Sequence, residues 1–214
     1  MHIHKSRPTF LPILILVSRF LPAFFWILII FGFDDFNVAA LTLLCVGIHE
    51  LGHGVRIRII QGARAGLKTT LSGFRMSRQK HISYLADASV YLAGPLSNLL
   101  AIPIFISLPF FSYEIKKLFF ALSLATSLSN LLPIKGYDGY GIISSLSCHF
   151  GTEERVLPIL RRVSFTLILF LCLLSFYIVA KIGSSYWMAG LFVISLIKEI
   201  AESLKNNFPS FEEI

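Results

Sequence analysis

The sequence has few charged residues for its length. Asp, Glu, Lys and Arg together make up 14% of the 214 residues, whereas hydrophobic residues make up 55%. A soluble globular domain typically has about 25% charged residues and about 45–50% apolar ones. This balance excludes an ordinary soluble domain. We therefore expect one membrane-embedded domain, because it accounts for nearly all of the length.

Cysteine is also scarce. Cys45, Cys148 and Cys172 form no close pair and no C-x-x-C pattern, so nothing indicates a disulfide framework. The N-terminal residues lack a short apolar segment followed by small residues, so we expect no removable signal peptide.

The net charge of +7 raises the question of nucleic-acid binding. The basic residues lie mostly between the apolar runs, where such residues set the orientation of a membrane protein. This distribution argues against a nucleic-acid partner and in favour of the lipid bilayer.

The apolar runs predict an all-α polytopic membrane protein with about six transmembrane helices. The run over residues 10–33 is broken by Arg19 and Pro22, and a charge within the bilayer is costly. We therefore interpret residues 11–17 as a short strand or an interfacial segment, with one tilted helix over 10–33 as the alternative. The predicted spans are about 20–33, 37–60, 84–110, 115–132, 163–180 and 186–197. They form one membrane-embedded domain over 20–200, between an N-terminal segment (1–19) and a cytosolic tail (201–214).

Positive charge predicts the orientation of these spans. The connection after the second span contains no acidic residue and seven basic ones, namely Arg56, Arg58, Arg64, Lys68, Arg75, Arg78 and Lys80. Basic connections face the cytosol, which places both termini there. The same connection is interrupted by Gly and rich in Ser and Thr, so we expect a small cytosolic β-hairpin around residues 67–76.

An H-E-x-x-H pattern lies in the second predicted span. It places His49 and His53 on one helical face, where both can bind one tetrahedral zinc ion. Glu50 lies beside the first histidine and is the expected general base. The alternative is a pair of histidines that are merely hydrogen-bonded, which would be costly in an apolar helix.

A catalytic zinc site needs a third ligand from elsewhere in the chain. Asp138 follows the fourth span and should lie at the cytosolic depth of His49 and His53. The alternative is that Asp138 is only a turn residue in Y-D-G. Glu114 lies on the opposite side, and Glu153 and Glu154 are weaker competitors in a hydrophilic loop.

Three segments together, HELGH, GPLSN and NLLPIKGYDG, resemble the signatures of the site-2 proteases. These are zinc metalloproteases that cleave within or beside transmembrane helices. The likeness covers residues 20–197 and is nearest to the branch of the stage IV sporulation protein FB. Tyr140 departs from the second glycine that many relatives have there. The matching positions are Gly94, Pro95 and Asn98 in G-P-x-x-N, and Asn130, Pro133, Asp138 and Gly139 in N-x-x-P-x-x-x-x-D-G.

The resemblance implies one Zn²⁺ per chain, with Asp138 as the third ligand and Asn130 as a substrate-binding residue. A simple interhelical hydrogen bond is the alternative for Asn130. Pro133 would end the helix before Asp138. Gly94, Pro95, Asn98 and Gly139 are expected to be structural residues near the site. The hairpin would add an unwound substrate to its free edge, or alternatively bind anionic lipid headgroups.

The sequence therefore predicts an intramembrane zinc endopeptidase in a bacterial plasma membrane, with its active site towards the cytosol. Its substrate would be a membrane-bound protein or peptide, and a regulatory membrane partner is also expected. The alternatives are a catalytically silent zinc-binding adaptor and, ranked last, a metal transporter. Cys45, one turn before His49, either faces the site or belongs to the core, which is the preferred interpretation.

Overall fold

The computed structural model describes most of the chain between Asp35 and Ala201. The described residues are 35–62, 66–70, 73–77, 83–182, 190, 192–197 and 199–201. The predicted first span, the segment 11–17 and residues 202–214 of the predicted tail lie outside them.

Long helices dominate the described chain, and a short strand pair interrupts them. The elements in chain order are α2 (Phe36–Gln61), β1 (Gly66–Thr70), β2 (Gly73–Ser77), α3 (Tyr84–Ser107), α4 (Tyr113–Asn130), α5 (Asp138–His149) and α6 (Glu153–Ile182).

Local sequence explains where these helices begin and end. Ser83 and Ser112 cap α3 and α4, since each side chain accepts the backbone N–H of the third residue of its helix. Helix α2 ends at Gly62, whose φ of 62° is in the left-handed region that favours glycine. Its N–H donates to the carbonyl of Arg58.

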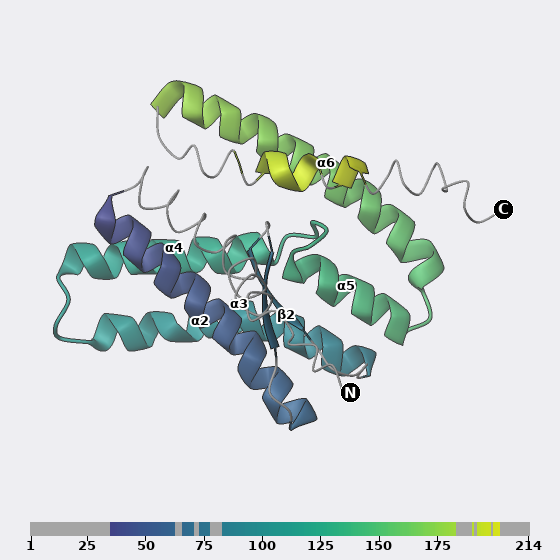
Figure 1. Cartoon of the computed structure of the whole chain (residues 1–214), viewed down its shortest axis with the longest axis horizontal. Coiled ribbons are helices and arrows are strands. Elements are labelled where there is room, and N and C mark those ends of the chain that lie inside the picture. Colours follow the sequence, from purple (N-terminus) through teal and green to yellow (C-terminus); the bar gives the residue numbers. More distant parts are fainter. Residues whose placement is uncertain are drawn as a thin grey trace, which may run out of the picture.

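Helix α3 is the centre of the arrangement, since it packs against α2, α4 and α5 (Figure 1). Helix α2 crosses the α3–α4 pair, and α6 packs on α5. The strands β1 and β2 are antiparallel and pair Gly66 with Ser77 and Thr70 with Gly73.

Small residues allow α2 and α3 to approach closely. A Cβ atom on Gly52 would lie 2.5 Å from the carbonyl oxygen of Ala93 and 2.6 Å from Oγ of Ser97. Ser97 also donates across the interface to the carbonyl of Ile48 at 2.9 Å. Small residues at helix interfaces are the usual means of close packing in membranes, where apolar burial between helices is a weak driving force.

A compact core joins α2, α3 and α4, and its α2 residues precede His49 along the helix. Leu41, Cys45, Phe105 and Phe119 are buried together. The rings of Phe105 and Phe119 stack with centroids 3.9 Å apart. Cys45 is fully buried, and its Sγ lies 3.2 Å from Oγ of Ser123. This placement agrees with the preferred interpretation of Cys45 as a core residue.

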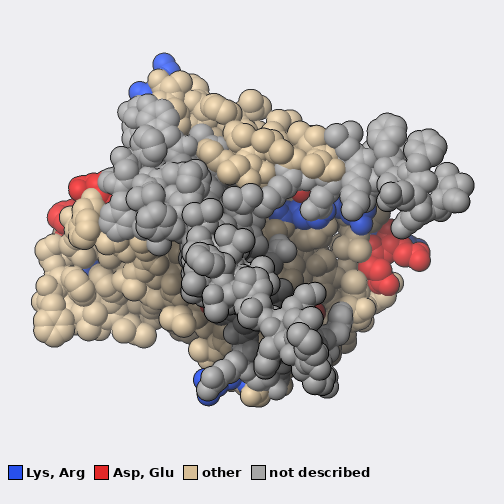
Figure 2. All heavy atoms as spheres, viewed as in Figure 1, with Lys and Arg blue, Asp and Glu red and all other residues tan. Residues whose placement is uncertain are grey.

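Among the described residues, three helices are long and apolar enough to cross a membrane, judged by length and composition. They cover Phe36–Ile60, Tyr84–Ser107 and Glu153–Lys181. Helix α6 also exposes a large apolar face, which includes Phe165, Phe170, Leu173 and Phe176. Uncharged residues make up most of the described surface in Figure 2. These features indicate a membrane protein.

The six predicted spans are only partly supported. Helix α4 matches the predicted fourth span in position but is not among the three helices that satisfy the length and hydropathy criteria. The sequence predicts a connection between the fourth and fifth spans, whereas this interval contains α5 and the first ten residues of α6. Both were missed because they are short or polar relative to a bilayer-crossing run.

The close contact at Gly52 makes a testable prediction for α2. Gly52→Ala should lower the stability of the folded protein by about 1–3 kcal/mol, because the added methyl overlaps α3. Gly47→Ala is the matched control on the same helix, since a Cβ there meets nothing within 4 Å. Thermal unfolding in detergent measures the difference. Equal melting temperatures for the two variants would contradict the tight interface.

Candidate metal centre

Helix α2 carries two histidines on one face. Residues four apart in an α-helix lie almost directly above one another. His49 and His53 are both buried, and their Nε2 atoms are 3.2 Å apart. Their rings meet edge to face, with centroids 4.8 Å apart. The helix therefore presents two imidazole nitrogens to one point inside the bundle.

The chain between α4 and α5 brings Asp138 to the same point. Helix α4 ends at Asn130, and Ile134 is fully buried within the turns that follow. Tyr137 donates its N–H to the carbonyl of Ile134, and α5 then begins at Asp138. A Cβ atom on Gly139 would overlap the carbonyl oxygen of Leu131. Glycine at that position lets the start of α5 pack directly on the end of α4.

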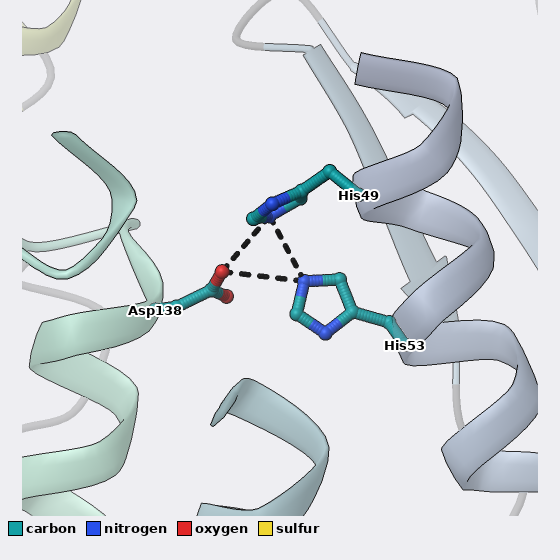
Figure 3. Close-up of side chains that lie close together, drawn as sticks. All are labelled: His49, His53 and Asp138. Carbon is teal, nitrogen blue, oxygen red and sulfur yellow. Dashed lines mark hydrogen bonds and ion pairs between the residues drawn. The ribbon is translucent and has the colours of Figure 1, made fainter. Parts of the chain in front are cut away.

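The three side chains form a small triangle (Figure 3). Oδ2 of Asp138 lies 2.9 Å from Nε2 of His49 and 3.3 Å from Nε2 of His53. Zinc binds nitrogen and carboxylate oxygen at about 2.0–2.2 Å, so tetrahedral ligand atoms are about 3.3 Å apart. All three separations agree with this spacing to within a few tenths of an ångström. The three residues could therefore hold a metal ion.

Hydrogen bonding prepares His53 as a ligand. Its Nδ1 lies 2.7 Å from the carbonyl oxygen of Val90 on α3. A carbonyl only accepts, so Nδ1 carries the hydrogen, and the neutral ring has its lone pair on Nε2. That lone pair faces the carboxylate of Asp138, which is also an acceptor. Two acceptors this close are stabilised by a shared cation, which is what a metal would supply.

The environment keeps Asp138 in its charged form. Burial raises the pKa of the Asp138 carboxyl, but hydrogen bonds and electrostatic interactions with His49 and His53 lower it by more. The pKa therefore lies below its ordinary value. The first turn of α5 adds to this effect, because the N-terminal end of a helix favours negative charge.

Gly94 of the GPLSN segment is in contact with both imidazoles. A Cβ atom there would overlap Nε2 of His53 and would lie 2.8 Å from Cε1 of His49. Pro95, the next residue, is fully buried, and its carbonyl accepts the hydroxyl of Ser127 at 3.1 Å. The backbone of α3 therefore forms one wall of the site.

The remaining predicted residues lie near the site or behind it. Glu50 is half-buried beside His49, and Pro133 lies in the turns between α4 and α5. Asn130 is half-buried and donates its Nδ2 to the carbonyl of Thr126 in its own helix. Within the part of the chain that the structure describes, Asn130 makes no hydrogen bond to His49, His53 or Asp138. Asn98 is fully buried in α3.

Three supporting groups were not predicted. The carbonyl of Val90 has no sequence signal, because any residue supplies one. Ser164, fully buried in α6, accepts the backbone N–H of Lys135 at 2.8 Å and so holds the turns before Asp138. A Cβ atom on Gly141 would lie 2.6 Å from the ring of Tyr91. Ser164 had a detectable signal, since it is a hydroxyl within an apolar run.

Tyr140, the departure noted from the sequence, is half-buried in the first turn of α5. The next residue, Gly141, makes the close contact with α3.

The chain is similar to known proteins in its fold. No family model and no curated protein matches the chain. The fold is similar to that of a solved structure, the site-2 protease from Methanocaldococcus jannaschii. The two share 18% sequence identity with a TM-score of 0.59, over 86% of this chain and 88% of that one. At this identity the likeness shows the fold alone, and the chain has a site-2 protease-like fold.

The contact at Gly94 predicts a loss of metal affinity on a minimal change. Gly94→Ala should weaken zinc binding by about 10–100-fold, as expected when residues behind metal ligands are disturbed. The physical reason is that the methyl group displaces both rings. Competition with a chromophoric chelator measures the affinity, and Gly47→Ala serves as the control. Unchanged affinity in Gly94→Ala would show that the rings do not need this space.

Proposed function

We propose that this chain is an intramembrane zinc endopeptidase that hydrolyses peptide bonds in or near transmembrane segments of membrane-bound substrates. The observation that carries the proposal is the buried triangle of His49, His53 and Asp138 within a site-2 protease-like fold. Two neutral nitrogen donors and one carboxylate are a ligand set typical of catalytic zinc, which keeps one further position open.

Each residue has a distinct task in this proposal. His49, His53 and Asp138 hold the ion, which supplies Lewis acidity that favours proton loss from water and polarises a carbonyl group. Glu50 follows His49 directly and lies about 60° around the helix from His53, given 3.6 residues per turn. Glu50 accepts a proton from the attacking water and passes it to the leaving amine.

The buried position of the site suits hydrolysis in a membrane. His49, His53 and Asp138 are each at most 9% exposed, so their charges and dipoles act in surroundings that screen them weakly. Electrostatic stabilisation of a transition state is strongest in such a site.

Substrate handling is proposed from two further features. Asn130 would bind the substrate backbone through the amide oxygen that its bond to Thr126 does not use. The β1–β2 pair follows α2 directly and has edges on which an unwound substrate segment could add as a strand. We further propose a bacterial plasma membrane location, a cytosolic active site and a regulatory membrane partner.

Glu50→Gln is the direct test of the mechanism. The variant should retain zinc, because the three ligands are unchanged, and should lose cleavage by a factor of at least about 100, the smaller end of the usual contribution of a general base. Glu114→Gln is the matched control, since Glu114 lies in the exposed first turn of α4. Cleavage of membrane substrates is compared by proteomics of cells that express each variant. Full cleavage by Glu50→Gln would overturn the mechanism.

Zinc should also stabilise the fold. Removal of zinc with a chelator should abolish cleavage and lower the melting temperature, and added zinc should restore both, because a ligand bound only to the folded state stabilises it. Asp138→Ala should show little of this zinc-dependent rise. A melting temperature that ignores zinc in the unsubstituted protein would contradict the site.

A further inference from the structure

Asn98 lies in the interior of the helix bundle. It is 0% exposed, and neither Oδ1 nor Nδ2 has a hydrogen-bond partner among the described residues. Buried amides almost always have partners, so an exception requires an explanation. A substrate peptide is not the explanation, because complete burial between helices closes Asn98 to a bulky ligand.

His49 has the complementary deficiency. Its Nδ1 is also buried and has no partner in the described part of the chain, whereas the same atom of His53 is hydrogen-bonded to the carbonyl of Val90. Histidines that bind a metal almost always donate their other ring N–H to an acceptor, which fixes the tautomer and the ring orientation. One of the two histidines therefore lacks the support that the other has.

The contacts between α2 and α3 place Asn98 close to His49. The helices are antiparallel, because residues later in α2 contact residues earlier in α3. The pairs are Arg56 with Ser89, His53 with Val90 and Ile48 with Ser97. The next turn of α3 after Gly94 carries Asn98 and therefore lies beside the turn of α2 that precedes His49, on the inner side of the interface.

Side-chain direction shortens the remaining gap. Asn98 is four residues after Gly94, so their Cβ positions are about 5–6 Å apart on one face of α3. A helical side chain extends back over the turn that precedes it, which brings the amide of Asn98 towards Gly94. The Cβ position of Gly94 is itself only 2.8 Å from Cε1 of His49, the atom bonded to Nδ1. We infer that the amide of Asn98 and Nδ1 of His49 are close enough for one water molecule to bridge them.

We propose that Asn98 is a positioning residue for His49. Its amide oxygen accepts, through one buried water, the Nδ1 hydrogen of His49, so that Nε2 faces Asp138 and His53 with its lone pair free. The assignment rests on the proposed metal site and adds to it an outer partner for the second histidine. It also accounts for two unpartnered groups with a single bridge.

Zinc affinity of the full chain in detergent micelles tests the assignment. Asn98→Leu keeps the size but removes the acceptor, and should weaken zinc binding about 10–100-fold. Asn98→Asp keeps an acceptor oxygen and should restore most of the affinity. Ser123→Ala is the matched control, because Ser123 is a fully buried polar residue in the same three-helix interface and should leave affinity unchanged.

The outcomes separate this inference from the proposed function. Failure of the unsubstituted protein to bind zinc overturns both. Normal affinity in Asn98→Leu, an equal loss in Ser123→Ala, or no recovery in Asn98→Asp overturns the role of Asn98 and leaves the metal site standing.

A spectroscopic measurement on the unsubstituted protein covers the case in which Asn98→Leu does not fold. Nitrogen-15 NMR of the zinc-loaded protein, labelled at histidine, should show a slowly exchanging Nδ1 hydrogen for His49. Exchange as fast as that of the exposed His149 would overturn the bridge.

Discussion

The contact between the Asp138 carboxylate and the two imidazoles of α2 is the interaction around which the described helices are arranged. A charged group inside an apolar bundle is costly unless it is paired. Here the pairing requires residues from helices almost ninety positions apart in sequence to meet within 2.9–3.3 Å. Helices α2 and α5 each pack against α3, and this shared packing brings the two histidines of α2 to Asp138 of α5. The central position of α3 therefore allows the buried charge to be paired.

Each neighbouring element contributes one restraint to this cluster. Val90 fixes the tautomer of His53, and Ser164 holds the turns before Asp138 from the side of α6. The restraints are mostly hydrogen bonds to backbone groups, which are satisfied inside the bundle and need no solvent. Helix α6 also bears the large apolar face. The buried hydroxyl of Ser164 therefore links this helix to the turns before the metal centre.

Much of the site could be predicted from the sequence, because its chemistry depends on residue type and spacing. His49 and His53 share a face through helical periodicity, and the apolar runs indicated a membrane protein with α2 and α3 nearly as observed. Helix α5 could not be predicted in this way. Twelve residues with several Ser and Gly have no strong apolar period, and the helix depends on its contacts with α3. The backbone carbonyl of Val90 is equally invisible, since its role comes from position and not from its side chain.

Gly52, Gly94, Gly139 and Gly141 have a shared consequence for how the protein tolerates sequence change. None of them carries a functional group, yet each occupies a place where a single methyl would meet another helix, a turn or an imidazole ring. Positions that are sensitive to substitution are therefore expected at the closest contacts between elements as well as among the residues that perform chemistry. In this fold the lack of a side chain at a glycine is as specific a requirement as a ligand atom.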